Sequence, residues 1–508
     1  MNVVSASLVL VVLPICESAR ILAILPTPSY SHQIAFHPLW KELSLRGHQV
    51  TLITTDPIDD HNLVNLTQID LKFSYDTFKK YRNDILYASF PKSIYIAFSL
   101  LIKVCDPQLA HPDVQALIKN PNERFDVVIV QGGRWPFVVF AERFRCPLIT
   151  ISTMRFPNAV YNILGNPLHS TVYPDFMVIG NPSLWGRVYS VVYDLVMNYY
   201  WRTTLMSLSQ GIADKHFGTN YSKVADIIKN NSMTFINRDT VFYENMPLLP
   251  NFINIGGMPQ RLSSEALPKD LQATLDNAVE GFVYFSLGTN VKSKELSERN
   301  LNVILETFAE LPYLVLWKYE EDMENKPRNV ITRKWLPQAS VLSHRNIKVF
   351  VTQGGVQSLD EAKYNNVPTV GMPFFGDQIY NVLRMVERGM GLSVDFRNLN
   401  KNIFKSTILE VIQNPIYKKN VETLSRLVLD QPMSGLDQAV WWTEFVIRHK
   451  GAEHLRSPFL EVSDYQYYYL DVFFVLCVTL LGIFAIVLFF IKCLVKTICR
   501  RMLKLKNE

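Results

Sequence analysis

Cysteine is scarce in this sequence, and several features that would define a protein class are missing. Six cysteines among 508 residues are too few for a disulfide scaffold. No Cys/His spacing is typical of a metal site, and the sequence has no repeat of about 20–50 residues. A composition of 48% hydrophobic and 19% charged residues excludes a disordered or collagen-like chain. We therefore expect a globular protein of more than one domain, without a metal or a cofactor.

The excess of positive charge is confined to the C-terminal end. The formal net charge of the whole chain is +5, and the last 17 residues, 492–508, contain six basic residues and one acidic residue. The rest of the chain is therefore neutral. A nucleic-acid-binding protein needs positive charge on its folded domain, so no nucleic-acid partner is expected.

Residues 472–491 form a run of 20 uncharged, mainly apolar residues, VFFVLCVTLLGIFAIVLFFI. A helix of this length spans about 30 Å, the hydrocarbon thickness of a bilayer. The alternative, a buried core helix, rarely continues this far without a polar face. Tyrosines precede the run within the linker 451–471, and the basic tail 492–508 follows it. The positive-inside rule therefore places the tail in the cytosol and the body on the other side.

Residues 1–18 resemble a secretory signal peptide. Positions 3–13 are mostly apolar and Cys16-Glu17-Ser18 suits cleavage, although no positive charge precedes the apolar part. A first β-strand is the alternative. The two ends together predict a single-pass type I membrane protein that contacts lipid through its C-terminal span. The final residues, Lys504-Leu-Lys506-Asn-Glu508, resemble the dilysine signal of endoplasmic reticulum membrane proteins, which favours a lumenal body in that membrane.

A lumenal body would use N-glycosylation acceptors. Asn65, Asn220 and Asn230 each begin an Asn-x-Ser/Thr sequon. Of the cysteines, only Cys105 and Cys146 would lie in the lumen. The sequence leaves open whether they pair.

Strands and helices alternate in two halves of the chain. The first half, 19–255, predicts strands at 21–25, 50–54, 126–130 and 148–152, a helix at 33–45, and a mostly helical and irregular stretch at 160–245. Proline and glycine residues at 247–259 suggest a domain boundary. The second half, 256–450, predicts strands at 282–287, 313–317, 349–352 and 369–372 and helices at 296–311, 356–364 and 378–388. Two α/β halves place a ligand cleft between them, at the carboxyl ends of the strands.

The segment 335–381, WLPQASVLSHRNIKVFVTQGGVQSLDEAKYNNVPTVGMPFFGDQIYN, resembles the signature of the UDP-glycosyltransferase family. FVYFSLGTN at 282–290 is its upstream companion, and LPTPSYSH at 25–32 and the terminal span fit the membrane-bound animal branch. The Gln353 form, TQGG, resembles arthropod members. The resemblance implies a GT-B fold, in which two Rossmann-like domains face a cleft. It assigns 19–255 to the acceptor and 256–450 to the UDP-sugar.

The residue types of this segment suit a nucleotide sugar. The indole of Trp335 can stack on a base, although a core tryptophan is the alternative, and Gln338 offers amide groups to uracil or ribose. Gly354 and Gly355 precede a helix whose N-terminal N–H groups attract phosphate, although a double glycine is more often a simple turn. The Ser286/Gly288 loop would likewise receive the leaving UDP.

Three residues of the following helix, Gln357, Ser358 and Glu361, share one face. By resemblance, Gln357 and Ser358 contact phosphate and Glu361 holds the ribose hydroxyls, whereas a Ser358–Glu361 capping box is the alternative. Asp377 and Gln378 would bind the transferred sugar, although Asp377 could simply be an N-cap. The resemblance gives His344 a structural place.

His32 follows the first predicted strand and matches the catalytic histidine of the family, the base that takes the acceptor proton. From the residues alone, a structural histidine is the more common alternative. The acid that usually orients this histidine is replaced by Gln131, whose oxygen can accept the ring N–H but cannot stabilise an imidazolium as a carboxylate would. The phosphate-side histidine is replaced by Gln353.

These features predict a UDP-glycosyltransferase that moves a hexose, preferably glucose, with inversion to a hydroxyl of a small lipophilic alcohol or phenol. Aromatic residues such as Tyr199, Tyr200 and Trp201 suit such an acceptor, or they belong to the core or a membrane-facing surface. A lumenal pseudoenzyme that binds nucleotide sugar or lipophile without turnover is the second hypothesis, motivated by Gln131 and Gln353. A cell-surface receptor is the third. The oligomeric state, a homo-oligomer included, is left open.

Overall fold

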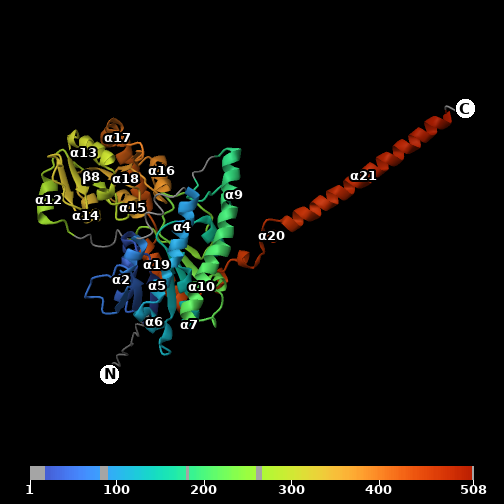
Figure 1. Cartoon of the computed structure of the whole chain (residues 1–508), viewed down its shortest axis with the longest axis horizontal. Coiled ribbons are helices and arrows are strands. Elements are labelled where there is room, and N and C mark those ends of the chain that lie inside the picture. The colour runs from blue at the N-terminus through green and yellow to red at the C-terminus, as the bar shows by residue number, and fades with distance from the viewer. Residues whose placement is uncertain (1–17, 80–89, 179–181, 259–265, 506–508) are drawn as a thin grey trace, which may run out of the picture. The chain divides into compact units, whose positions relative to one another are not determined.

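The structure is a computed structural model of the whole chain, and it describes residues 18–79, 90–178, 182–258 and 266–505. The predicted signal peptide, 1–18, lies outside the described residues except for Ser18. The chain divides into two compact units, Met1–Arg456 and Ser457–Glu508. The first unit contains two parallel β-sheets with their helices, as Figure 1 shows.

The N-terminal sheet has seven parallel strands in the order β3-β2-β1-β4-β5-β6-β7. Its three central strands are buried along almost their whole length because helices cover both faces of a parallel sheet. The strands are β1 (Arg20–Leu25), β2 (Gln49–Thr54), β3 (Leu66–Asp70), β4 (Val127–Gln131), β5 (Leu148–Ser152), β6 (Asn231–Ile236) and β7 (Phe252–Asn254). The larger helices of this half are α2 (His37–Leu45), α4 (Phe90–Lys103), α6 (Pro112–Lys119), α9 (Leu184–Tyr200) and α10 (Met206–Phe217). Its shorter helices are α1 (Tyr30–Ile34), α5 (Cys105–Leu109), α7 (Val139–Phe144), α8 (Asn158–Ile163) and α11 (Val224–Lys229).

The helix predicted over 33–45 is two helices in the structure. The first, α1, ends at Ile34, and α2 begins at His37 with Pro38 in its first turn. Proline has no N–H to donate and its ring clashes with the preceding turn, so it is tolerated only where a helix begins. This break matters for the site because it makes α1 a single short turn that carries His32.

The stretch 160–245 is mostly helical, as predicted, but it also contains the strand β6. The side chains of Met233 to Ile236 are buried, and β6 pairs in parallel with β5 and β7. The sequence analysis missed β6 because Asn231, Ser232 and Thr234 interrupt its apolar character. It missed β7 because three residues are too few for a periodic pattern.

The C-terminal sheet has six parallel strands in the order β10-β9-β8-β11-β12-β13. Every strand and helix predicted for this half is present, with ends shifted by no more than two residues. The strands are β8 (Phe282–Ser286), β9 (Leu314–Lys318), β10 (Val330–Arg333), β11 (Ile347–Thr352), β12 (Thr369–Gly371) and β13 (Gly391–Ser393). The helices are α12 (Lys269–Asp276), α13 (Glu298–Ala309), α14 (Gln338–Leu342), α15 (Val356–Tyr364), α16 (Gln378–Glu387), α17 (Lys401–Gln413) and α18 (Pro415–Leu429).

One helix of the predicted C-terminal range 256–450 belongs to the other half. This helix, α19 (Gly435–Arg448), packs its buried Leu436, Ala439 and Val440 into the core formed by β1, β2 and α2. The structure therefore packs this last helix of the range 256–450 on the N-terminal sheet. The position of α19 in the sequence did not indicate that this helix packs on the N-terminal sheet.

The second unit contains α20 (Asp464–Tyr467) and the long helix α21 (Leu470–Leu505). Within α21, the candidate span 470–503 contains an 18-residue window with a mean hydropathy of 3.1, and none of this window is buried. By length and composition this helix is a candidate membrane span. It contains the predicted span 472–491 and continues into the basic tail as a helix.

Candidate active site

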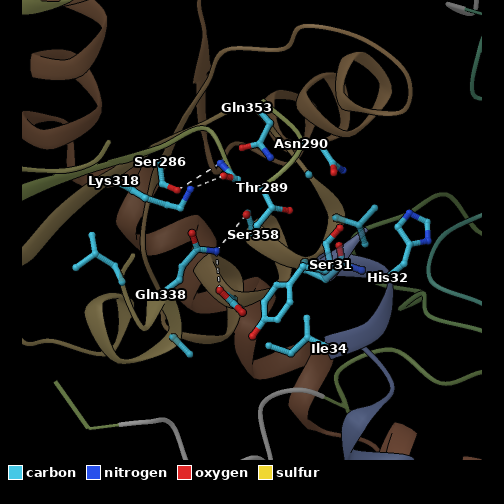
Figure 2. Close-up of a pocket in the computed structure, with 18 of the residues that line it drawn as sticks. Ser31, His32, Ile34, Ser286, Thr289, Asn290, Lys318, Gln338, Gln353 and Ser358 are labelled. Carbon is cyan, nitrogen blue, oxygen red and sulfur yellow. Dashed lines mark hydrogen bonds between the residues drawn. The ribbon is translucent and has the colours of Figure 1, made fainter. Parts of the chain in front are cut away.

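A cavity of about 330 Å³ lies between the two sheets, at the carboxyl ends of their strands. Loops and helix starts of both halves contribute to its wall, and Figure 2 shows Ser31, His32 and Ile34 of the N-terminal half together with residues of the C-terminal half. Ser29 Oγ donates to Asn290 Oδ1 at 3.2 Å and joins the halves beside the cavity. The cleft predicted from two α/β halves is therefore present.

Trp335 projects into this cavity instead of belonging to the core. Its side chain is 52% exposed, and the ring of Tyr30 meets it edge-on, with ring centroids 5.2 Å apart and planes at 84°. Lys318 Nζ lies 5.8 Å from the centre of the indole. The alternative of a core tryptophan is excluded, and contacts with Tyr30 and Lys318 hold the indole in place. Such a platform suits a planar base.

Gln338 is the centre of a polar cluster at the floor of the cavity. Its Nε2 donates to Glu361 Oε2 at 2.7 Å and to Ser358 Oγ at 3.1 Å, and its Oε1 accepts from the Tyr284 hydroxyl at 3.2 Å. Burial raises the pKa of Glu361 to about 7. Because Gly355, not Ser358, is the N-cap of α15, the capping-box alternative is wrong. Ser358 and Glu361 line the cavity instead, and Figure 2 shows Ser358 on its wall.

Ser286 and Gly288 lie where β8 ends, and Lys318 holds their loop. Lys318 Nζ donates to the Gly288 carbonyl at 2.9 Å (Figure 2). Gly288 has φ +74°, and a Cβ there would lie 2.2 Å from Nε2 of the buried Gln353. The left-handed backbone favours glycine at this position, and any side chain there would also displace the amide of Gln353. Lys318 Nζ also pairs with Glu320 Oε1 at 3.0 Å, so its positive charge beside this loop is partly balanced.

The start of α15 is open to the cavity. Gly355, Gln357 and Ser358 line it, and the first N–H groups of the helix have no intrahelical partner. Gly354 does not line the described cavity; it has φ +85° and packs against Val382, so it shapes the turn from β11 into α15. The helix start and Lys318 together make this wall suitable for an anion.

Asp377 and Gln378 line the cavity at the start of α16. Asp377 occupies the N-cap position, but its carboxylate accepts from Asn381 Nδ2 at 2.7 Å and not from the helix backbone. Gln378 Oε1 accepts from the Phe374 N–H at 2.9 Å. Burial raises the pKa of Asp377. The pair is thus held by its neighbours at the edge of the cavity, where hydroxyl groups could be bound.

His32 lies in α1, on the opposite wall of the cavity. Its Nδ1 lies 3.0 Å from Gln131 Nε2 and 2.8 Å from Thr153 Oγ1. Burial and the charge of Arg134 lower the pKa of His32 to about 4, so the ring is neutral at physiological pH. Gln131 lies behind His32 and does not line the described cavity.

The sequence analysis missed several residues that line this site. Tyr30, Thr153, Asn290 and Lys318 each follow or end a predicted strand. Their positions at the carboxyl ends of parallel strands could have identified them. Thr27 and Arg134, which contact each other behind His32, likewise follow the strands β1 and β4.

Other predicted residues lie away from the cavity. Of the aromatic residues proposed for the acceptor, Trp201 is buried in the core and Tyr199 is 72% exposed, and none of 199–201 lines the described cavity. His344 is buried at the N-terminal end of β11, where its Nδ1 accepts from the Asn346 N–H, as expected for a structural residue. Cys105 and Cys146 are free thiols.

The three sequons differ in their exposure. Asn220 and Asn230 are exposed, whereas Asn65 is half-buried and its Nδ2 donates to the Ser44 carbonyl at 3.3 Å. Glycosylation at Asn65, Asn220 and Asn230 stays a prediction.

Within the described residues, no group of three or more His, Cys, Asp or Glu side chains is arranged to hold a metal ion.

Comparison with known proteins identifies the family. The sequence model described as UDP-glucoronosyl and UDP-glucosyl transferase matches residues 20–507. The chain belongs to the UDP-glycosyltransferase family. UDP-glucosyltransferase 2 of Dactylopius coccus is 32% identical over 94% of each chain. UDP-glucuronosyltransferase 2C1 of Oryctolagus cuniculus is 31% identical over 88% of this chain and 93% of the relative.

Solved glycosyltransferases share the fold of this UDP-glycosyltransferase. The spinosyn forosaminyltransferase SpnP superposes with a TM-score of 0.58 at 16% identity, over 85% of this chain and 99% of its own. The glycosyltransferase VinC, in complex with dTDP, gives a TM-score of 0.57 at 16% identity, over 85% of this chain and 100% of its own. The predicted GT-B fold is confirmed. The protein is an enzyme that takes a sugar from a UDP-sugar donor and passes it to an acceptor.

Proposed function

We propose that this UDP-glycosyltransferase transfers a hexose, with glucose as the first candidate, to an oxygen of a small lipophilic acceptor, with inversion at the anomeric carbon. The observation that carries the proposal is the position of His32 in the same cavity as Trp335 and Glu361. The name of the Dactylopius relative supports glucose, and the name of the rabbit relative makes glucuronate the alternative.

In this proposal the C-terminal wall holds the donor. Uracil stacks on Trp335, Gln338 and Glu361 bind the ribose hydroxyls, and Asp377 with Gln378 binds the sugar. The Ser286–Gly288 loop, Gln353 and the start of α15 receive the diphosphate. Lys318 Nζ and the free N–H groups of α15 supply positive charge as UDP leaves, so the proposal involves no cofactor.

The N-terminal wall holds the acceptor, with its oxygen beside His32. For a hydroxyl acceptor, we propose that His32 is the general base. A base must be neutral before the reaction, and the low pKa of His32, caused by burial and by Arg134, meets that condition. The acceptor oxygen would attack the anomeric carbon from the face opposite to UDP.

The test is UDP release in detergent-treated membranes that express the wild type or His32→Ala. UDP-glucose, UDP-glucuronate, UDP-galactose and UDP-N-acetylglucosamine would each be supplied with simple phenols. Acceptor-dependent release from one donor, lost in His32→Ala but kept in His61→Ala, would support the proposal. His61 is a matched control because its side chain is fully exposed to solvent. Release from His32→Ala at the wild-type rate would overturn the assigned role.

A pseudoenzyme is the second candidate, and one observation favours it. The amide nitrogen of Gln131, instead of a carboxylate, faces the histidine. A protein that binds UDP-glucose in calorimetry but releases no UDP with any acceptor would support this candidate against the transferase.

We also propose that α21 anchors the enzyme in the endoplasmic reticulum membrane with a lumenal body and a cytosolic tail. The apolar helix at 470–503 and the basic residues that follow it support this orientation. A lumenal body would carry glycans that endoglycosidase removes, and the exposed Asn220 and Asn230 are the first candidates. No mobility shift after digestion of the wild type, together with protease cleavage of the body in sealed microsomes, would contradict the orientation.

A further inference from the structure

The helix α9 has polar side chains on its buried side and apolar side chains on its exposed side. Ser190, Asp194 and Met197 are its buried residues. Inside the protein, Asn158 Nδ2 donates to Asp194 Oδ2 at 3.3 Å. Most helices at the surface of a soluble protein bury their apolar face and expose their polar face to water. The polarity of α9 is the reverse.

The helix α13 shows the ordinary arrangement in the same protein. Its Ile304 and Phe308 are buried, whereas Glu298 and Glu306 are exposed. The first unit therefore contains surface helices of the usual polarity. The reversal in α9 is a property of that helix and needs its own explanation.

The exposed apolar side chains of α9 form one continuous stripe. Figure 1 shows α9 as a long helix at the outside of the N-terminal half. The side chains of the stripe recur three or four residues apart, which places them on one face of a helix. The α9 stripe consists of Trp185, Val188, Val192, Leu195, Val196 and Tyr199, which are 42–78% exposed. Single exposed apolar residues are ordinary, but a continuous apolar patch of this length marks an interaction surface.

The charges of this segment are of one sign on its exposed side. Arg187, Asp194 and Arg202 are the charged residues of 184–205. The acid is buried, whereas both arginines are exposed. Tryptophan and tyrosine lie toward the two ends of the stripe, and valine and leucine lie between them. This combination suits a lipid surface, because arginine can donate to lipid phosphates and aromatic rings are enriched at the level of the headgroups.

The proposed span keeps the first unit close to a bilayer. Residues 457–469 connect Arg456 to the start of α21. Fully extended, this linker reaches no more than about 50 Å. A contact between the tethered body and the same bilayer is therefore intramolecular, and even a weak affinity is enough to maintain it.

A second copy of the chain would fit the α9 stripe less well than lipid does. Two such faces in contact would bring exposed arginines together, and neither face would offer a carboxylate. Like charges that meet in an interface oppose association. The phosphates of a bilayer supply the negative charge that a second copy lacks.

We propose that α9 is a second membrane contact of this enzyme. It lies in the interface of the bilayer that α21 spans, with the α9 stripe in the acyl region and Arg187 and Arg202 at the phosphates. It does not span the bilayer, because Asp194 and Met197 are buried in the protein. The inference rests on the proposed anchorage by α21. It adds that a defined face of the body docks on the membrane.

The experiment uses the full chain in phosphatidylcholine vesicles, with the fluorophore NBD on a single cysteine. Val192→Cys reports on the α9 stripe, and the native Cys477 reports on the proposed span. Val279→Cys is the matched control, because Val279 is also an exposed valine but lies in the C-terminal half. An interfacial helix inserts about 5–10 Å into the bilayer, so nitroxide-labelled phosphatidylcholine should quench the label at 192 at least about twofold. The label at 279 should keep its fluorescence.

A second variant tests the stripe itself. Val188→Asp together with Val196→Asp, added to the labelled Val192→Cys protein, places two charges in the apolar face. Both valines are exposed, so the fold should be kept, and calorimetric UDP binding would verify this. Quenching at 192 should fall to the level at 279, while quenching at Cys477 stays unchanged.

The possible failures point to different conclusions. Quenching at Cys477 with none at 192 would overturn the inference alone. No quenching at Cys477 would overturn the proposed anchorage and the inference with it. Oxidative cross-linking of two chains through Val192→Cys, without quenching by lipid, would identify a second copy as the occupant and overturn the membrane contact. UDP release from the same vesicles tests the proposed transfer separately.

Discussion

The amide nitrogen of Gln131 lies 3.0 Å from Nδ1 of His32, so the residue that replaces the usual acid donates to the ring where a carboxylate would accept. The sequence suggested that a glutamine oxygen would accept the ring N–H. That oxygen is instead bound by Thr27. The consequence is that an N–H donor, instead of a carboxylate acceptor, faces the ring of His32 from behind.

Removal of the Gln131 side chain should slow transfer. In Gln131→Ala the ring keeps only Thr153 behind it, and a misplaced catalytic group can cost about 10²-fold in rate. We expect kcat with 4-nitrophenol to fall at least about tenfold while UDP affinity stays unchanged. Gln131→Asp should raise kcat for non-acidic acceptors. A Gln131→Ala rate equal to that of the wild type would show that this position does not orient His32.

Truncation of Trp335 should weaken UDP binding. Stacking of a base on an aromatic side chain is worth about 1–3 kcal/mol by alanine substitution, so Trp335→Ala should raise the Kd for UDP about 5- to 150-fold. Trp335→Phe should recover part of the loss. Trp185→Ala is a matched control because that indole is also exposed but does not line the cavity. Equal UDP affinity in calorimetry for the wild type and Trp335→Ala would exclude stacking here.

Binding of UDP should become tighter as the pH rises through about 7, the value to which burial raises the pKa of Glu361. Ribose hydroxyls donate to the ionised carboxylate, so binding favours the charged form and releases a proton from the protonated one. Affinity should therefore be lower below this pH and constant above it. Calorimetry in two buffers of different ionisation enthalpy would detect the released proton. In Glu361→Gln, both the proton release and the change of UDP affinity around pH 7 should be absent. A wild-type profile identical to that of Glu361→Gln would contradict the assignment.

Loss of Lys363 should destabilise the whole enzyme. Its buried ammonium binds Asp239 of the N-terminal half and, at 2.9 Å, Asp360 of α15. Removal of one partner from a buried ion pair costs about 3–5 kcal/mol because the remaining charge is uncompensated. Lys363→Met should lower the thermal midpoint in detergent by several degrees. Lys334→Met, which breaks the exposed pair with Asp322, should leave the midpoint unchanged.

Most of the C-terminal wall was predicted from the sequence because its residues lie in one continuous segment. Trp335, Gln338, Ser358 and Glu361 occupy fixed positions around β11 and α15, and a local strand-loop-helix unit is enough to bring them to one edge of a sheet. Their chemistry follows from residue type. The alternation of strands and helices likewise determined the parallel sheets, and an uncharged run of 20 residues determined the apolar helix.

The N-terminal wall could be predicted only in part. His32 was found through its match to the family motif, but its partners come from separate loops: Gln131 is 99 residues away and Thr153 is 121. The return of α19 to the first sheet is a similar case, since its apolar face fits either sheet by pattern alone. Which sheet buries it depends on the packing of both halves.

The sequence by itself determined the family, the two parallel sheets and the identity of the reactive groups, because these depend on residue type and local spacing. Only the tertiary structure decided the direction of the hydrogen bonds behind His32. That direction depends on a buried arginine that can donate but not accept, and on a threonine hydroxyl with a single proton. Contacts between such distant residues are absent from any local pattern, and they decide which side-chain atoms face Nδ1 of His32.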